Sequence, residues 1–240
     1  MLKSIAAAAT KTLLVLSLLA IGSSGVWAAT ISCADSSVNT LGGLLGMPGA
    51  GYSGCTSQDK IWSGFANGSG TAIPPAWLAA ITYSPYPGYD LHDFTLSANN
   101  LATGSPNYLT AGTYTLDYLI SIDPTSATYT SDWITSVQVS ANVSLPGGAG
   151  SVTDTKALYT SNGGTYLGSV TSTNGLSSSI GVDQKSIWVQ ETITITGPAN
   201  VHSITDEFTE TFVPEPASMA LMGAGLLALG GLLRRKKLAQ

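Results

Sequence analysis

One place in the chain brings together side chains suited to proton transfer or metal binding. His92 lies between two acids, Asp90 and Asp93. An imidazole beside carboxylates is a common arrangement in general acid–base sites and in metal sites. The only other histidine, His202, has no acid next to it in the sequence. We favour a solvated turn for His92 and a strand face for His202, with neither residue in a functional site.

A second acidic group, Asp206, Glu207 and Glu210, lies near the end of the body of the chain. Clustered carboxylate oxygens are the ligands that Ca²⁺ prefers, so a calcium site is one interpretation. The interpretation we favour is an acidic strand end that leads toward a membrane. We therefore expect no metal and no cofactor.

Motifs that activate a nucleophile or bind a phosphate are absent from the sequence. There is no Gly-x-Ser-x-Gly turn and no glycine-rich phosphate loop with its lysine. The paired carboxylates of a glycoside hydrolase remain an alternative, because the fold rather than the sequence sets their spacing. We assign no catalytic residue and expect that the protein is not an enzyme.

Aromatic side chains offer another chemistry, since their flat faces can stack on sugar rings. Most aromatic residues of a β-sandwich fill its core, however, and that is the interpretation we favour here. The candidates are Trp62, Trp77, Trp133, Trp188, Tyr83, Tyr86 and Tyr89.

The elements that must position these residues are predicted to be strands. In residues 112–122, apolar side chains recur at every second position, which is the period of a strand with one buried face. Residues 161–164, Ser-Asn-Gly-Gly, predict a hairpin turn. We expect strands at 76–83, 90–97, 112–122, 133–143, 152–160, 166–173, 186–196 and 201–212. A mostly β fold follows, an antiparallel β-sandwich of jelly-roll type.

Both cysteines, Cys33 and Cys55, lie near the start of the body. In an exported protein a disulfide is the default for such a pair, and it would close a loop that is worth roughly 3 kcal/mol. A catalytic thiol or a zinc site is disfavoured, because no histidine lies at a common ligand spacing. The glycine-rich segment between the cysteines is expected to be irregular.

The segment after Cys55 contains Asp59 and Lys60, followed by aromatic residues. We expect Asp59 and Lys60 to face water or to pair with each other. Ile61, Trp62 and Phe65 are expected to dock this segment on the core.

The charge of the body excludes one class of partner. Residues 29–212 contain thirteen acids, three lysines and no arginine. Contacts to phosphates need a basic surface, so nucleic-acid binding is not expected.

The first 28 residues have the pattern of a secretory signal peptide. Lys3 and Lys11 form a basic start, residues 13–21 are apolar, and small residues precede a cleavage point between Ala28 and Ala29. An N-terminal signal helix and export are therefore expected, and an uncleaved anchor is the alternative.

The last segment has three parts in a fixed order. A turn of Pro214, Glu215 and Pro216 is followed by an uncharged apolar run at 217–233, and then by four cations. Seventeen residues of helix reach about 25 Å, the short limit for crossing a hydrocarbon core of about 30 Å. The basic residues would stay on the cytoplasmic side. These residues are Arg234, Arg235, Lys236 and Lys237.

The three-part tail resembles the PEP-CTERM sorting signal of Gram-negative bacteria. The resemblance covers about a tenth of the chain, and it implies recognition and processing by an exosortase, a membrane-embedded enzyme. It also implies a precursor that is anchored in the inner membrane after passing the export machinery. The processed protein would then reside at the cell surface or in the extracellular matrix. A plain C-terminal membrane anchor is the alternative.

These observations divide the chain into a signal peptide (1–28), an exported β-sandwich (29–212) and a sorting segment (213–240) with a transmembrane helix at 217–233. We expect a non-enzymatic surface or matrix protein, for which exopolysaccharide is a candidate partner. A sorted carbohydrate-binding module and a sorted polysaccharide hydrolase are the two alternatives. The first predicts exposed aromatic residues in a row, and the second predicts a cleft with convergent ionisable groups.

Overall fold

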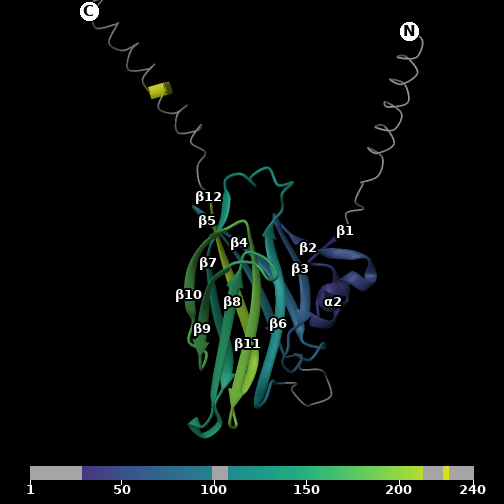
Figure 1. Ribbon diagram of the computed structural model, residues 1–240, viewed down its shortest axis with the longest axis vertical. Coiled ribbons are helices and arrows are strands. Elements are labelled where there is room, and N and C mark those ends of the chain that lie inside the picture. Colours follow the sequence, from purple (N-terminus) through teal and green to yellow (C-terminus); the bar gives the residue numbers. More distant parts are fainter. Residues whose placement is uncertain (1–28, 99–107, 213–223, 227–240) are drawn as a thin grey trace, which may run out of the picture.

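The computed structural model describes residues 29–98, 108–212 and 224–226. Two β-sheets face each other and enclose the core (Figure 1). One sheet has the strand order β1-β2-β3-β6-β11-β8-β9, and the other has the order β10-β7-β12-β5-β4. The strands are β1 (Ala29–Ser32), β2 (Tyr52–Ser57), β3 (Lys60–Asn67), β4 (Leu78–Tyr86), β5 (Tyr89–Ser97), β6 (Gly112–Ile122), β7 (Asp132–Ser144), β8 (Ser151–Tyr159), β9 (Tyr166–Thr173), β10 (Ser178–Gln184), β11 (Ser186–Thr196) and β12 (Asn200–Phe212).

Strands that are distant in sequence lie side by side in both sheets. β12 pairs with β5 and β7, and β11 pairs with β6 and β8, in every case antiparallel. Of the strand pairs described, only β1 with β2 is parallel. The last two strands therefore occupy the interior of the two sheets, where they are covered by neighbours on both edges.

Alternation of side chains along the strands builds the core. In β8, every second residue from Val152 to Leu158 is buried, as a half-buried strand requires. Four aromatic side chains, Trp62, Phe94, Tyr118 and Phe208, form the centre between the sheets. The ring centroid of Trp62 is 5.8 Å from that of Phe94 and 5.4 Å from that of Phe208, and the centroids of Phe94 and Tyr118 are 5.1 Å apart. Trp62 and Phe65 are buried in the core as predicted, whereas Ile61, the third expected anchor, is only half-buried.

The eight predicted strands are all present, and β6, β9 and β11 have the predicted bounds. Strands β1, β2, β3 and β10 were not predicted, because glycine, serine and charged residues interrupt their alternation. The segment that was expected to be irregular contains helix α2 (Leu41–Gly46). Thr40 begins this helix, since its hydroxyl accepts a hydrogen bond from the Gly43 amide at 3.1 Å.

A bulge in β3 explains why both Trp62 and Phe65 point inward. The register between β3 and β6 shifts between Ser63 and Ala66, and Gly64 there has a φ of 64°. A Cβ on Gly64 would lie 2.8 Å from the Trp188 ring, so glycine is required for both backbone and space.

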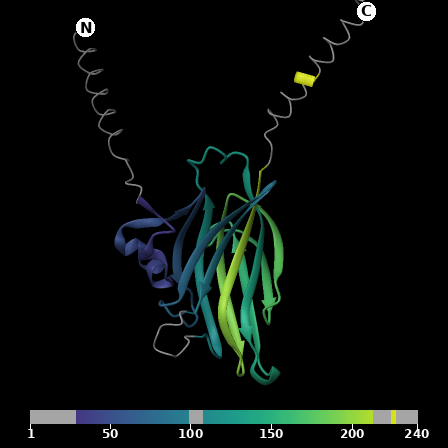
Figure 2. The same cartoon turned by 180° about the vertical axis from the view of Figure 1, so that it is seen from behind.

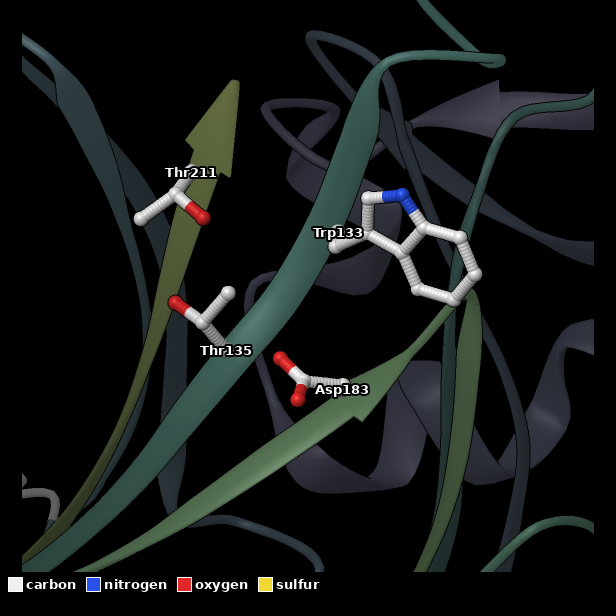
Figure 3. A pocket seen from close by; sticks show the side chains of 4 residues that line it. All are labelled: Trp133, Thr135, Asp183 and Thr211. Carbon is white, nitrogen blue, oxygen red and sulfur yellow. The ribbon is translucent and has the colours of Figure 1, made fainter. Parts of the chain in front are cut away.

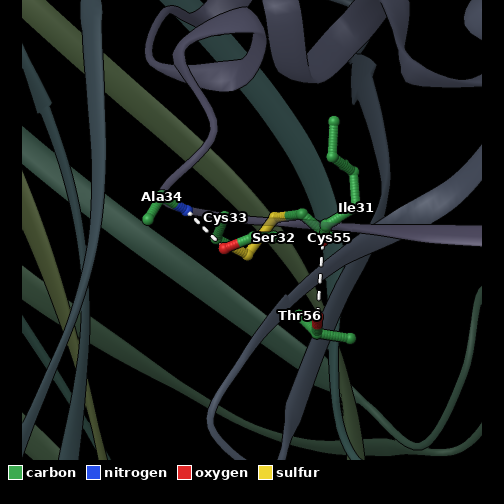
Figure 4. The surroundings of a disulfide bond; sticks show 6 residues. All are labelled: Ile31, Ser32, Cys33, Ala34, Cys55 and Thr56. Carbon is green, nitrogen blue, oxygen red and sulfur yellow. Dashed lines mark hydrogen bonds between the residues drawn. A yellow bond between two sulfur atoms is a disulfide. The ribbon is translucent and has the colours of Figure 1, made fainter.

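The predicted disulfide between Cys33 and Cys55 is present and ties the residues after β1 to β2 (Figure 4). Near it, Thr56 Oγ1 donates to the Ile31 carbonyl at 3.4 Å, and the Ala34 amide donates to Ser32 Oγ at 3.2 Å. The covalent bond therefore reinforces the one parallel strand pair. Figure 2 shows this segment and α2 packed at one side of the sandwich.

Several predictions lie outside the described residues. They concern the signal peptide at 1–28 with its cut after Ala28, and nearly all of the segment 213–240, of which residues 224–226 are helical. Within the ranges that the structure describes, no helix is both long and apolar enough to cross a membrane. β1 begins and β12 ends at the same end of the sandwich (Figures 1 and 2).

Candidate functional site

A fully buried lysine lies between the two sheets, surrounded by three carboxyl groups. Lys156 Nζ is 2.7 Å from Glu191 Oε1, 2.7 Å from Asp206 Oδ1 and 3.4 Å from Asp154 Oδ1. All four side chains are at most 1% exposed. We call these four residues the Lys156 cluster.

Strand geometry places these groups together. Asp154 and Lys156 are two residues apart on β8 and therefore point to the same face. Glu191 lies directly opposite Lys156 in the register between β8 and β11. Asp206 reaches the cluster from β12 in the other sheet, so the ion pairs bridge the two layers of the sandwich.

A tyrosine completes the surroundings of Asp206. Tyr118, which is buried on β6, donates a short hydrogen bond from its hydroxyl to Asp206 Oδ2. Tyr118 also lies against Phe208 and Phe94, so aromatic rings flank the cluster on the side of the core. Bulk water is excluded from this position.

Burial dominates the electrostatics of the Lys156 cluster. Desolvation raises the pKa of Asp154 to about 6, against the attraction of Lys156. Burial likewise raises the pKa of Glu191 to about 7, and burial together with the charge of Glu191 raises that of Asp206 to about 7. Desolvation alone would lower the pKa of Lys156, but the attraction of the three carboxylates outweighs it and raises that pKa.

A second buried lysine lies between β3 and β12. Lys60 Nζ is 2.6 Å from Glu210 Oε2 and 2.8 Å from Asp59 Oδ2. His92 Nε2, on β5, is 3.2 Å from Glu210 Oε2. The expected pairing of Asp59 with Lys60 is therefore confirmed, with Lys60 completely buried.

Asp59, His92 and Glu210 offer ligand atoms within 4.8 Å of one another, a spacing that suits a metal ion. His92 Nδ1 and Glu210 Oε1 are also buried without a hydrogen-bond partner. The Lys60 ammonium, however, already contacts both carboxylates. A metal ion would have to displace this cation, so we assign the group to ion pairing.

Two predictions about these residues were wrong. His92 is not in a solvated turn: it is completely buried on β5. Asp206, Glu207 and Glu210 do not form an acidic strand end either. Strand alternation directs Asp206 and Glu210 inward to different lysines, while Glu207 is only half-buried. The same alternation separates the three carboxylates, so they do not form one calcium site.

His202 lies on the face of β12, as predicted. Its Nε2 is 2.9 Å from Ser144 Oγ, and its ring centroid is 4.0 Å from that of Tyr108. These contacts give the residue a packing role.

A surface hollow of about 340 Å³ lies on β7, β10 and β12 (Figure 3). It is lined by Trp133, Thr135, Asp183 and Thr211, which together provide an aromatic ring, a carboxylate and two hydroxyls. Lys185 Nζ is 4.4 Å from the centroid of the Trp133 ring. It also donates hydrogen bonds to the backbone carbonyls of Tyr129 and Thr130, in the loop before β7. Sequence alone did not single out this hollow, because its residues come from three separate strands.

The other aromatic candidates divide between core and surface. Trp62, Trp77 and Trp188 are buried, which confirms the packing interpretation for them. Tyr86 and Tyr89 are exposed at the β4–β5 turn and stack on each other, with centroids 5.0 Å apart. Their faces are therefore partly covered by their mutual contact.

Comparison with curated proteins finds no match. Among solved structures, the family 11 carbohydrate-binding module of cellulase Lic26A-Cel5E of Clostridium thermocellum matches with 7% identity and a TM-score of 0.23, over 64% of this chain and 88% of the module. CsCBM6-3 from Clostridium stercorarium, in complex with cellobiose, matches with 17% identity and a TM-score of 0.20, over 57% of this chain and 82% of that one. TM-scores of this size do not define a common fold.

One family model matches the chain at residues 212–236, and it describes the PEP-CTERM protein-sorting motif. The match begins at the last residue of β12 and includes the predicted Pro214, Glu215 and Pro216 as well as Arg234, Arg235 and Lys236. It covers about a tenth of the chain, as the resemblance did. The protein is therefore one of those that carry a PEP-CTERM sorting motif.

Proposed function

We propose that the protein is an exported, non-enzymatic component of the cell surface or exopolysaccharide matrix of a Gram-negative bacterium. An exosortase would sort and process it through the segment that follows β12. The observation that carries this proposal is the sorting motif at residues 212–236. The precursor would be held in the inner membrane by a helix at 217–233, with the following basic residues on the cytoplasmic side.

The body would be a jelly roll that serves as the exported cargo. In support, the last two strands insert between earlier ones, β12 between β5 and β7, and β11 between β6 and β8. The return of a late strand to lie beside earlier ones is a feature of Greek-key connections, and a jelly roll contains two Greek keys. In this arrangement, the strands nearest the C-terminus, β11 and β12, are not at the edges of the sheets.

A non-enzymatic role is supported by the placement of the acids. The buried carboxylates of the Lys156 cluster and of Glu210 contact lysines. The hollow at Trp133 contains a single carboxylate, that of Asp183. Glycoside hydrolysis commonly needs two carboxyl groups on either side of the scissile bond, and this hollow does not supply them.

The sorting role can be tested by replacing Glu215 with Ala in the producing bacterium. Export should continue, while release of the C-terminal segment should be lost, so that intact-mass analysis finds the unprocessed tail. Glu207→Ala, at a half-buried site on β12, is the matched control and should leave processing unchanged. An unaltered C-terminal mass in the Glu215 variant would contradict the proposal.

A second candidate function is binding of a neutral polysaccharide at the Trp133 hollow. The observation that favours it is the combination of an indole ring with the carboxylate of Asp183 and two threonine hydroxyls. A ring that supplies apolar contact and a few polar groups that fix orientation are typical of small-molecule sites. The volume of about 340 Å³ would fit one sugar unit at a time, with the polymer continuing across the open surface.

This binding can be tested by electrophoresis in gels that contain exopolysaccharide from the producing strain. The wild-type protein should be retarded, and Trp133→Ala should restore free mobility. Tyr166→Ala, at an exposed aromatic residue on β9, is the control and should remain retarded. Equal mobility of all three proteins with and without polysaccharide would exclude the hollow as a binding site.

A further inference from the structure

The Lys156 cluster brings an amine and a carboxyl group together in a position that water does not reach. Lys156 Nζ lies 2.7 Å from Asp206 Oδ1, and both side chains are at most 1% exposed. Asp206 Cγ, the atom that the amine would attack, is bonded to this oxygen, so the contact holds the two reacting groups side by side, as proximity catalysis requires. The two residues lie on different sheets, at β8 and β12.

We propose that Lys156 and Asp206 join in an intramolecular amide bond between Nζ and Cγ, a cross-link from β8 to β12. The bond would form without a separate enzyme once the two sheets have packed together. This inference goes beyond the proposed function, because neither sorting nor sugar binding requires it.

The protonation state that the reaction needs can be reached inside the cluster. An ammonium beside a carboxylate and an amine beside a carboxylic acid differ only by the position of one proton along the 2.7 Å contact. Burial in a low-dielectric core penalises the charged form of both groups. The attraction of the three carboxylates keeps the ammonium favoured at rest, so the neutral pair is reached by transfer of this one proton to Asp206, whose acid form burial favours.

Two neighbours have the roles that amide formation requires. Glu191 Oε1 is 2.7 Å from Lys156 Nζ, where its carboxylate can accept a proton from the attacking nitrogen. The Tyr118 hydroxyl donates to Asp206 Oδ2, where negative charge develops when the carboxyl carbon becomes tetrahedral. Tyr118 hydrogen-bonds to Asp206, which makes Asp206 the favoured electrophile over Glu191 and Asp154.

The step balances without an added reactant. Lys156 Nζ attacks Asp206 Cγ, and Glu191 takes the proton that the nitrogen loses. Glu191 then returns the proton to the departing oxygen, the C–O bond breaks, and one water molecule leaves. Glu191 ends as it began, and the ammonium and carboxylate have become one amide and one water.

The cross-link would secure the strand that leads into the sorting segment. It would join two residues that are 50 positions apart in the sequence. Closing a loop of this length restricts the unfolded chain in the same way as a disulfide. Unlike a disulfide, the amide would survive reducing conditions, so the sandwich would hold its last strand while the tail is processed.

The bond can be tested on the purified full-length chain. After reduction of the disulfide and denaturation, the intact mass should be lower than the sequence mass by one water molecule. Proteolysis should then release one peptide that contains Lys156 joined to another that contains Asp206. A folded wild-type protein with the full sequence mass would overturn the proposal, and so would a linkage that maps to another pair of residues.

Three variants make the test specific. Glu191→Gln keeps both reacting groups and the side-chain volume, and it should fold without the cross-link or form it at least ten times more slowly. Lys156→Met should have the full sequence mass. Lys185→Met, at a lysine outside the cluster, is the control and should still lose one water. A Glu191→Gln protein that is cross-linked as fast as wild type would contradict the assigned role of Glu191.

Discussion

Replacing Asp154 with Asn should change how the stability of the sandwich depends on pH. Asp154 is buried in the Lys156 cluster, and desolvation raises its pKa from 3.8 to about 6. The folded state therefore holds this proton more tightly than the unfolded state does. The stabilisation that protonated Asp154 gives to the folded state is complete below the pKa of this residue in the unfolded chain. It is lost as the pH rises through its pKa in the folded protein.

The size of the effect follows from the two pKa values. A separation of about two pKa units corresponds to about 3 kcal/mol, most of which, about 2 kcal/mol, is lost between about pH 4 and pH 7. Asparagine cannot ionise and avoids this loss. The free energy of unfolding of Asp154→Asn should therefore rise relative to wild type by about 2 kcal/mol across that interval. The proposed amide would remove the Lys156 charge and strengthen the trend, so its direction does not depend on that bond.

Urea unfolding at a series of pH values measures this difference, provided that both proteins unfold in a single transition with equal m-values. Asp183→Asn, at an exposed carboxylate on β10, is the matched control because it leaves the cluster intact. A constant difference between Asp154→Asn and wild type over the whole interval would refute the reasoning that burial controls this carboxyl group.

Three further stability predictions can be checked by the same unfolding measurement. Cys55→Ser should lower the free energy of unfolding by about 3 kcal/mol, because it opens the loop that the bond to Cys33 closes. Wild-type protein with its disulfide reduced should be destabilised by the same amount, and a variant as stable as wild type would contradict the prediction. Gly64→Ala should cost at least about 1–2 kcal/mol, because it forces a positive φ and a contact with Trp188; an unchanged midpoint would show that the bulge relaxes. Lys60→Met should cost about 3 kcal/mol, at the low end for buried ion pairs because one partner is partly exposed; a stabilised variant would mean that the lysine is dispensable.

Strand patterning was sufficient to predict much of the fold. Alternation in residues 112–122 and 186–196 gave the bounds of β6 and β11 correctly, because these strands have one face in the core. The short strands β1 and β2 depend on pairing with each other and on the disulfide, and neither has a regular pattern. Tertiary context decided their structure, and sequence periodicity does not report it.

The buried lysines were the main feature that sequence reasoning missed. Lys156 belongs to the sequence Asp-Thr-Lys, whose alternating polar residues suggest an exposed face, yet Asp154 and Lys156 are both on the inner face. The alternation within the strand contained the signal. Lys156 is an even number of residues away from buried Val152 and Leu158, so its side chain lies on the same inner face. His92 could have been found in the same way, since it shares parity with buried Phe94 and Leu96.

The sorting motif was recognised because its information is local. A proline-flanked turn, an apolar run and a basic cluster are contiguous in sequence, whereas the Trp133 hollow needs three strands to assemble. The role of the hollow depends on long-range pairing of β7 with β10 and β12, which the sequence did not specify.

Top-down mass spectrometry of the mature protein, isolated from the surface or matrix of the producing bacterium, tests the sorting proposal most directly. We expect a chain that begins at Ala29 and ends within or before the apolar run at 217–233, without Arg234 and the residues beyond it. A surface protein that still carries both its first 28 residues and the basic residues at 234–237 would contradict export and processing through the PEP-CTERM motif.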